Sequence, residues 1–321
     1  MPELELKVLG VDEEAQLVRA LRLEAVSGGA LPGYAAGAHI SVRLPGGDDR
    51  PYSLVNLDPA LETEKTVPEY RLGVRLEADS QGGSSFMHAL KPGDIIIASS
   101  PKNDFPLSGD EGASVLIAGG IGITPIASMA SELLRKNRPF VLHYSGRTED
   151  SLAFLAPLRA LLGGRLIEHY DNIADKLFDI EAVLSPAQPG QHLYVCGPKG
   201  MIEAVQAGAR GRGWSDAQIH FELFTPPAPQ TGDRPFEIEI ASTGETLTVP
   251  VGESIIQVLE AAGHDVMYDC RRGDCGICQT GVISGDPDHR DLILSDSEKA
   301  EGKIMQICVS RARSAKLVLD L

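Results

Sequence analysis

The stretch Asp269–Cys278 reads DCRRGDCGIC and places three of the chain's five cysteines within nine residues. Four residues separate Cys270 from Cys275, two separate Cys275 from Cys278, and twenty-nine lead on to Cys308. A C-x4-C-x2-C run with one distant cysteine is the spacing of plant-type 2Fe–2S clusters, in which thiolates surround the irons. The sequence therefore predicts cluster ligands at Cys270, Cys275, Cys278 and Cys308.

Two glycines inside this stretch support the same interpretation. Gly273 and Gly276 allow the close approach and unusual dihedral angles of a loop that wraps inorganic sulfide, and turn N–H groups there can bond the sulfurs. The alternatives are structural zinc and unligated thiols. Structural zinc usually has two paired Cys or His arms, whereas this stretch has one pair with an odd cysteine upstream.

The residues around the cysteines predict a small separate domain. The Pro- and Gly-rich stretch 226–235 is typical of a linker. After it we expect a hairpin turning at Gly244, a short amphipathic helix ending at Gly263, and the cysteine loop. The HRD triplet at His289 is interpreted as a solvated loop ahead of a Ser-capped helix in SDSEKA.

Upstream of the linker the pattern changes twice. In residues 106–225, apolar strands alternate with helical segments, which predicts a parallel α/β sheet covered on both faces. Thr124 and Pro125 are predicted as the N-cap and first residue of a helix. In residues 1–105, short β-rich runs alternate with Gly/Pro turns, which predicts an antiparallel barrel. We therefore expect domains at 1–105, 106–225 and 236–321, joined by the linker 226–235.

Four further motifs are weak alone. RPYSL at Arg50 reads as plain strand, and GGSS at Gly82 is either a phosphate cradle or a Ser-capped helix start. GGIGITP at Gly119 follows a strand and opens a helix, as a pyrophosphate-binding turn does, although it departs from G-x-G-x-x-G. CGP at Cys196 ends a later strand, where ligands bind in open α/β folds, but a lone buried cysteine is usually packing.

Taken in order, these motifs resemble the ferredoxin–NADP reductase superfamily over essentially the whole chain, and most of all the phthalate dioxygenase reductase family. The resemblance implies a flavin barrel, a nicotinamide domain and a β-grasp plant-type ferredoxin. It implies that Arg50 pairs with the flavin phosphate, Tyr52 packs on the flavin ring and Ser53 bonds near its N5. The implied flavin contacts are Arg50, Tyr52, Ser53, Leu54, Gly82, Gly83, Ser84, Ser85 and Phe224. The implied nicotinamide contacts are Gly120, Gly122, Thr124, Pro125, Cys196, Gly197 and Pro198, with Thr124 and Cys196 facing the ring.

The family also implies FMN as the flavin and NADH as the donor. Ser145 and Arg147 follow the second strand of the parallel segment, where a 2′-phosphate would bind, while Glu149 and Asp150 would repel it. NADPH therefore stays open. The resemblance also implies that hydride passes from the nicotinamide to the flavin and that single electrons then reach the cluster.

Composition limits the partners. The formal net charge of −16 disfavours nucleic-acid binding and suits a partner with a basic docking patch. No signal peptide is visible, and the uncharged run 112–131 is too rich in glycine for a membrane span. The uneven cysteines fit a reducing cytoplasm. The family resemblance, rather than composition, implies a reductase that serves a Rieske-type terminal oxygenase. The alternatives are a reductase for a haem-thiolate monooxygenase and a non-enzymatic iron–sulfur protein.

Overall fold

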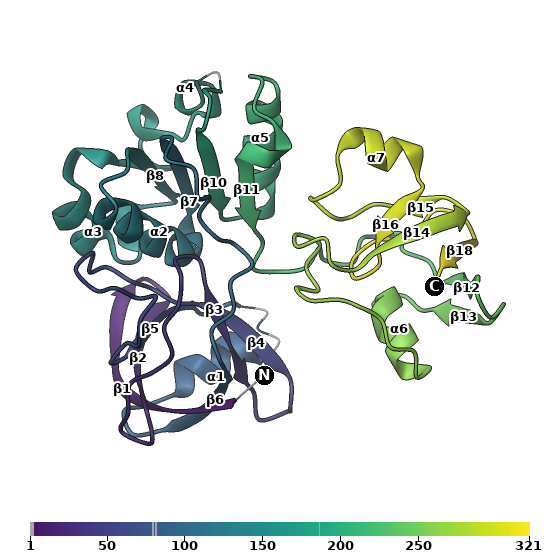
Figure 1. Ribbon diagram of the computed structural model, residues 1–321, viewed down its shortest axis with the longest axis horizontal. Coiled ribbons are helices and arrows are strands. Elements are labelled where there is room, and N and C mark those ends of the chain that lie inside the picture. Colours follow the sequence, from purple (N-terminus) through teal and green to yellow (C-terminus); the bar gives the residue numbers. More distant parts are fainter. Residues whose placement is uncertain (1–2, 79, 81, 186) are drawn as a thin grey trace. The chain divides into compact units, whose positions relative to one another are not determined.

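The computed structural model describes residues 3–78, 80, 82–185 and 187–321. The chain divides into two compact units, Met1–Glu222 and Leu223–Leu321 (Figure 1). The first unit contains both the predicted barrel and the predicted parallel sheet, and the second contains the cysteine-rich segment. Within the described residues, no helix combines the length and the apolar character needed to cross a membrane.

The N-terminal half of the first unit is an antiparallel sheet in the order β4-β3-β6-β1-β2-β5. An isolated bridge between Leu54, directly after β4, and Leu72 in β5 joins the two edge strands, so the sheet closes into the predicted barrel. Side chains alternate as a half-buried strand requires: Leu6 and Val8 are wholly buried. The elements are β1 (Glu3–Ala15), β2 (Val18–Ala25), β3 (His39–Arg43), β4 (Asp49–Ser53), β5 (Tyr70–Arg75), α1 (Gly83–Ala89) and β6 (Ile95–Ser99).

The C-terminal half of the first unit is a parallel sheet in the order β11-β10-β7-β8-β9. Strand β7 comes first in the chain yet lies between β8 and β10, so the strand order reverses there, and ligands bind open α/β sheets at such a point. The elements are β7 (Ser114–Gly119), α2 (Ile123–Arg135), β8 (Phe140–Gly146), α3 (Leu155–Leu162), β9 (Leu166–Tyr170), α4 (Ile180–Val183), β10 (His192–Cys196), α5 (Lys199–Arg210) and β11 (Ile219–Glu222).

The second unit is built on a mixed sheet in the order β13-β12-β18-β14-β16. Strands β12 and β18 are parallel, and the other neighbours are antiparallel. The predicted hairpin turns at Gly244, whose φ is 73°. The elements are β12 (Phe236–Ile240), β13 (Thr246–Val249), α6 (Ile255–Ala261), β14 (Gln279–Ser284), β15 (Pro287–Asp288), α7 (Asp296–Glu301), β16 (Ile304–Gln306), β17 (Arg311–Ala312) and β18 (Lys316–Asp320).

Two local predictions were wrong. Thr124 is not an N-cap: a 3₁₀ turn over Gly120–Gly122 precedes α2, so Thr124 is already inside the helix and its hydroxyl donates back to the Ile121 carbonyl at 3.0 Å. The HRD triplet is not solvated, because Arg290 and Asp291 are 8% and 2% exposed. Buried charges need partners, and segments distant in the sequence supply some of them: Asp233 pairs with Arg290, and Ser310 pairs with Asp291.

Candidate functional site

The predicted flavin motif and the predicted phosphate turn lie against each other in the barrel. A side-chain carbon built on Gly83 would lie 3.0 Å from the Tyr52 hydroxyl and 3.1 Å from Arg50 Cγ. Glycine at that position therefore lets α1 begin directly beside β4. Two motifs thirty residues apart in the sequence thus lie side by side.

Side chains on this surface have the chemistry that a flavin phosphate and ring require. Arg50 is half-exposed, and its guanidinium lies 3.3 Å from the Asp48 carboxylate. Burial raises the pKa of Tyr52 to about 12, so its phenol stays protonated and neutral. Ser53 and Leu54 are buried, at 6% and 0% exposure, and so support the strand from inside.

Hydroxyl groups line the turn before α1. The Ser84 hydroxyl donates to the Ser80 hydroxyl at 3.0 Å and accepts from the Glu77 N–H at 3.1 Å. The Ser85 hydroxyl donates to the Gly82 carbonyl at 3.3 Å. Gly82 has a φ of 91°, a conformation that favours glycine. A hydroxyl proton rotates to suit its partner, so the Ser84 and Ser85 hydroxyls can turn towards an anion. The first helical turn carries no acidic residue that would repel it.

Helix α2 fastens the barrel to the parallel sheet. The Ser128 hydroxyl donates to the Leu54 carbonyl at 2.6 Å and accepts from the Asn56 N–H at 2.8 Å. At the start of the same helix, Thr124 Cγ2 would lie 2.8 Å from a side-chain carbon built on Gly73 of β5. Thr124 is therefore held directly beside the barrel, within the half of the unit that carries the nicotinamide motifs.

The two glycine-containing turns of the predicted nicotinamide site pack together at the strand-order reversal. Strands β7 and β10 are parallel neighbours, with Cys196 in register with Ala118. A side-chain carbon on Gly122 would lie 2.2 Å from the Cys196 carbonyl oxygen, and one on Gly197 would lie 3.0 Å from Gly119 Cα. The turns after β7 and β10 are thus in backbone contact, and only glycine permits this approach.

The side chains predicted to face the nicotinamide ring lie at this edge but are covered. Cys196 and Thr124 are each 1% exposed. Glu222 lies beside Cys196 in register on β11 and is 3% exposed. Sequence reasoning missed Glu222, although an acidic residue within the apolar run IHFELF was a signal for it.

The predicted 2′-phosphate position lies at the end of β8. Ser145 is 9% exposed within the strand, and Arg147 directly follows the strand and is exposed. The Glu149 carboxylate lies 2.6 Å from the Arg159 guanidinium, which also binds Glu168 at 2.6 Å. Arg159 therefore compensates the negative charge of Glu149, one of the two acidic residues that were expected to repel a phosphate.

Phe224 belongs to the second unit. Its predicted position over the flavin therefore stays a prediction. Close by, the Leu223 N–H donates to the Asp274 carboxylate at 2.8 Å. Asp274 lies inside the cysteine loop with its side chain 5% exposed, so its carboxylate attaches the loop to the residues that precede the linker.

The four predicted ligands gather in the second unit although Cys308 is far from the others in sequence. The Cys270 thiol contacts those of Cys275 and Cys308, and the Cys278 thiol contacts that of Cys308. Contact with Cys275 holds the pKa of the Cys270 thiol well below its usual range. The described residues hold no group of three or more His, Cys, Asp or Glu arranged for a metal ion; the four thiols form a chain of contacts instead.

The cysteine loop has the backbone that a cluster requires. Gly273 and Gly276 have φ values of 83° and 79°, as the sequence predicted. The Arg272 N–H donates to Cys270 Sγ at 3.3 Å, which is the kind of bond that tunes a cluster. Four gathered thiols, glycine-rich wrapping and an N–H aimed at sulfur together fit a cluster held by cysteine.

The HRD segment and Leu292, which follows it, form hydrogen bonds that hold this loop in place. The Leu292 N–H donates to the Gly273 carbonyl at 3.1 Å, and the Asp291 carboxylate accepts from the Ser310 hydroxyl at 3.3 Å. Asp291 thereby connects this segment to the residues between β16 and β17, which include Cys308. Arg290 is neutralised by the Asp233 and Asp288 carboxylates.

Comparison with known proteins agrees with this arrangement. Residues 238–313 match the family model for the 2Fe-2S iron-sulfur cluster binding domain. Residues 96–219 match the model for the N-terminal domain of the dimethylamine monooxygenase subunit DmmA-like proteins.

Three relatives extend over nearly the whole chain. Vanillate O-demethylase oxidoreductase of Pseudomonas sp. is 42% identical, with 96% of each chain covered. The heme-dependent oxidative N-demethylase beta subunit of Ectopseudomonas mendocina is 38% identical, with 99% of each covered. The solved structure of phthalate dioxygenase reductase, described as modular for electron transfer from pyridine nucleotides to [2Fe-2S], matches with a TM-score of 0.74 and 35% identity. The match covers 99% of this chain and 98% of that one.

Proposed function

Because this chain belongs to the phthalate dioxygenase reductase family, we propose that it carries electrons from NADH through FMN and a 2Fe–2S cluster to a Rieske-type terminal oxygenase. The chain is an oxidoreductase, the reductase component of a two-component oxygenase system. The observation that carries the proposal is that four cysteines of plant-type spacing lie together in one unit. In the other unit, the RPYS strand lies beside the serine turn, and the two glycine turns are in contact with each other.

The barrel residues would hold the flavin. Arg50 offers the flavin phosphate a charged guanidinium with several donors, and Ser84 and Ser85 offer it hydroxyl groups. Tyr52 stays neutral and places its ring beside them. When bound, FMN exchanges a hydride on one side for single electrons on the other. The protein's own contribution is to fix the ring against β4.

The glycine turns would hold the nicotinamide nucleotide. Their backbone contact leaves no room for side chains between β7 and β10, so the dinucleotide approaches the main chain directly. Thr124 and Cys196 would border the reacting ring, and each is 1% exposed in this structure. Hydride transfer needs the reacting atoms about 3–3.5 Å apart. The Ser128 contacts that fasten α2 to the barrel would help to hold the flavin side and the nicotinamide side of the site together.

NADH is the proposed donor, although one feature admits NADPH. Arg147 is exposed at the end of β8, and among the described residues its side chain has no ion-pair partner. Asp150 remains nearby to oppose a phosphate. Comparing kcat/KM for NADH and NADPH tests this choice directly.

Cys270, Cys275, Cys278 and Cys308 would hold the cluster. Among the described residues, none of the five cysteines forms a disulfide. Thiols stay reduced in the cytoplasm, and we place the protein there.

Two kinds of terminal oxygenase compete for this reductase. The likeness to vanillate O-demethylase oxidoreductase and phthalate dioxygenase reductase favours a Rieske partner. A haem enzyme is the second candidate, and the 38% identity to the beta subunit of a heme-dependent oxidative N-demethylase supports it.

The test mixes the purified reductase and NADH anaerobically with a Rieske oxygenase and, separately, with a haem monooxygenase. Rapid reduction of the Rieske cluster with slow reduction of the haem is the expected result. Preferential reduction of the haem would transfer the proposal to the second candidate. Reduction of neither, by a chain that bleaches its own chromophores with NADH, would reject both partners.

A further inference from the structure

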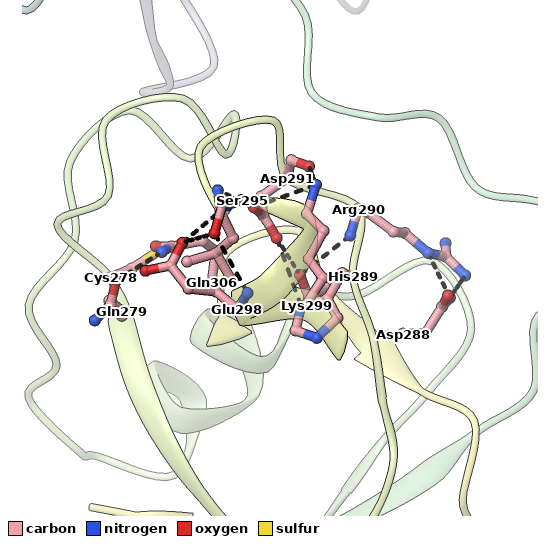
Figure 2. A network of polar contacts seen from close by, with 12 residues as sticks. Cys278, Gln279, Asp288, His289, Arg290, Asp291, Ser295, Glu298, Lys299 and Gln306 are labelled. Atoms are coloured by element: carbon pink, nitrogen blue, oxygen red, sulfur yellow. Dashed lines mark hydrogen bonds and ion pairs between the residues drawn. The ribbon is translucent and has the colours of Figure 1, made fainter. Parts of the chain in front are cut away.

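Gln306 is a fully buried polar side chain that lies between the two chain segments carrying the cysteines. It ends β16, two residues before Cys308, and is 0% exposed. In the sheet it stands directly opposite Gln279, which follows Cys278. Directly opposed residues of an antiparallel pair share one face of a sheet, so the two glutamines and the Cys278 sulfur meet there (Figure 2).

The amide of Gln306 has two partners among the described residues. The Cys278 thiol donates to Gln306 Oε1 at 3.4 Å, and Gln306 Nε2 donates to Gln279 Oε1 at 3.5 Å. Burying an amide is unfavourable unless its groups are hydrogen-bonded, and an apolar residue would fill this space without that requirement. What Gln306 provides at this position, and an apolar residue would not, is therefore a hydrogen bond with the Cys278 sulfur.

We propose that, once Cys278 ligates iron, the Gln306 amide donates an N–H hydrogen bond to Cys278 Sγ and so raises the reduction potential of the cluster. The proposal rests on the proposed function, in which Cys278 is a ligand. A ligating cysteine is a thiolate and has no proton to donate. A half-turn of the Gln306 amide group exchanges the positions of its oxygen and nitrogen. The nitrogen then faces Cys278 Sγ, and Gln306 becomes the hydrogen-bond donor. Gln279 is exposed and can rotate with it.

The direction of the effect follows from charge. Reduction adds one electron to the cluster without moving a proton, so the reduced form is the more negative. The positive end of an N–H dipole stabilises that form more than the oxidised form. Removing the donor should lower the ratio of reduced to oxidised cluster at a fixed potential by about tenfold, which corresponds to about 59 mV for one electron.

The experiment compares full-length wild type, Gln306→Met and Gln279→Met by redox titration of the cluster, followed by EPR. Methionine preserves volume while removing both amide groups. The Gln306→Met potential should fall by the amount given above, and the Gln279→Met potential by less than a third of it. A Gln306→Met protein with a normal 2Fe–2S spectrum and an unchanged potential would overturn the proposal.

A second measurement needs no stable variant at position 306. Wild type is labelled with ¹⁵N in the glutamine side-chain amide alone, and pulsed EPR of the reduced cluster is searched for ¹⁵N coupling. We expect coupling that persists in Gln279→Met, and its absence would also overturn the proposal. A wild-type protein that binds no cluster would instead reject the proposed function, so the two failures are distinguishable.

Discussion

Gly122→Ala is the substitution that best separates the nicotinamide site from the remainder of the electron path. The added carbon would lie 2.2 Å from the Cys196 carbonyl oxygen, and real contacts of this kind keep at least 3.0 Å. Both atoms nearest the new carbon belong to backbone, so the turns after β7 and β10 must separate by about 0.8 Å. The φ of Gly122 is −60°, which alanine adopts freely, so the separation is the whole perturbation. A misplacement of about 1 Å costs on the order of 10²-fold in rate.

The assay is stopped-flow reduction of the bound flavin by NADH, with flavin and iron content measured on the same sample. Gly122→Ala should reduce about 10²-fold more slowly than wild type while keeping both chromophores. Gly200→Ala is the matched control, because its added carbon has nothing within 4 Å, and it should behave as wild type. A Gly122→Ala protein that reduces within threefold of wild type would refute the assignment of these turns to the nicotinamide site.

Three further outcomes are expected. Ser128→Ala leaves two buried backbone groups of the barrel unpaired and should lower the free energy of unfolding by about 2–5 kcal/mol in urea. Ser131→Ala breaks one such bond and should cost about half as much, so equal losses would contradict the contact scheme. Arg50→Gln should raise the FMN dissociation constant by roughly 10–100-fold in a fluorescence titration, whereas Arg43→Gln, already paired with Asp49 and Glu3, should leave it unchanged. Burial lowers the pKa of His143 to about 4, so the unfolded chain takes up a proton that the folded chain excludes, and stability falls as pH drops from about 6.5 towards 4. Between pH 7.5 and 5.5, His143→Gln should lose about 1 kcal/mol less than wild type, and parallel pH profiles would contradict this.

The sequence-based predictions were most accurate where the spacing of residues along the chain alone determines the local structure. The cysteine interval, the glycines at 273 and 276, and the alternating strand patterns each reflect a local requirement. The structure therefore reproduces the barrel, the parallel sheet and the gathering of thiols. The pairing of Arg50 and Tyr52 with the serine turn was implied by resemblance and required the fold to bring the motifs together.

Where sequence reasoning failed, distant segments decided the outcome. The HRD triplet that begins at His289 is typical of a surface loop. Inside the second unit, however, Asp233 pairs with Arg290 and Ser310 pairs with Asp291. The run 149–162 has the composition of a single helix, yet α3 begins only at Leu155, because Phe154 takes the left-handed conformation with a φ of 58°. The sequence does not indicate that Gln306 lies beside Gln279, because only the pairing of β14 with β16 brings the two residues together.

The measurement that tests the central claim most directly is the visible and EPR spectrum of the purified chain before and after anaerobic NADH. We predict flavin bands above a broad iron–sulfur envelope, bleaching of both on NADH, and the signal of a reduced 2Fe–2S cluster. A chain that stays colourless after reconstitution with FMN, iron and sulfide, or whose cluster stays oxidised while the flavin bleaches, would contradict the account.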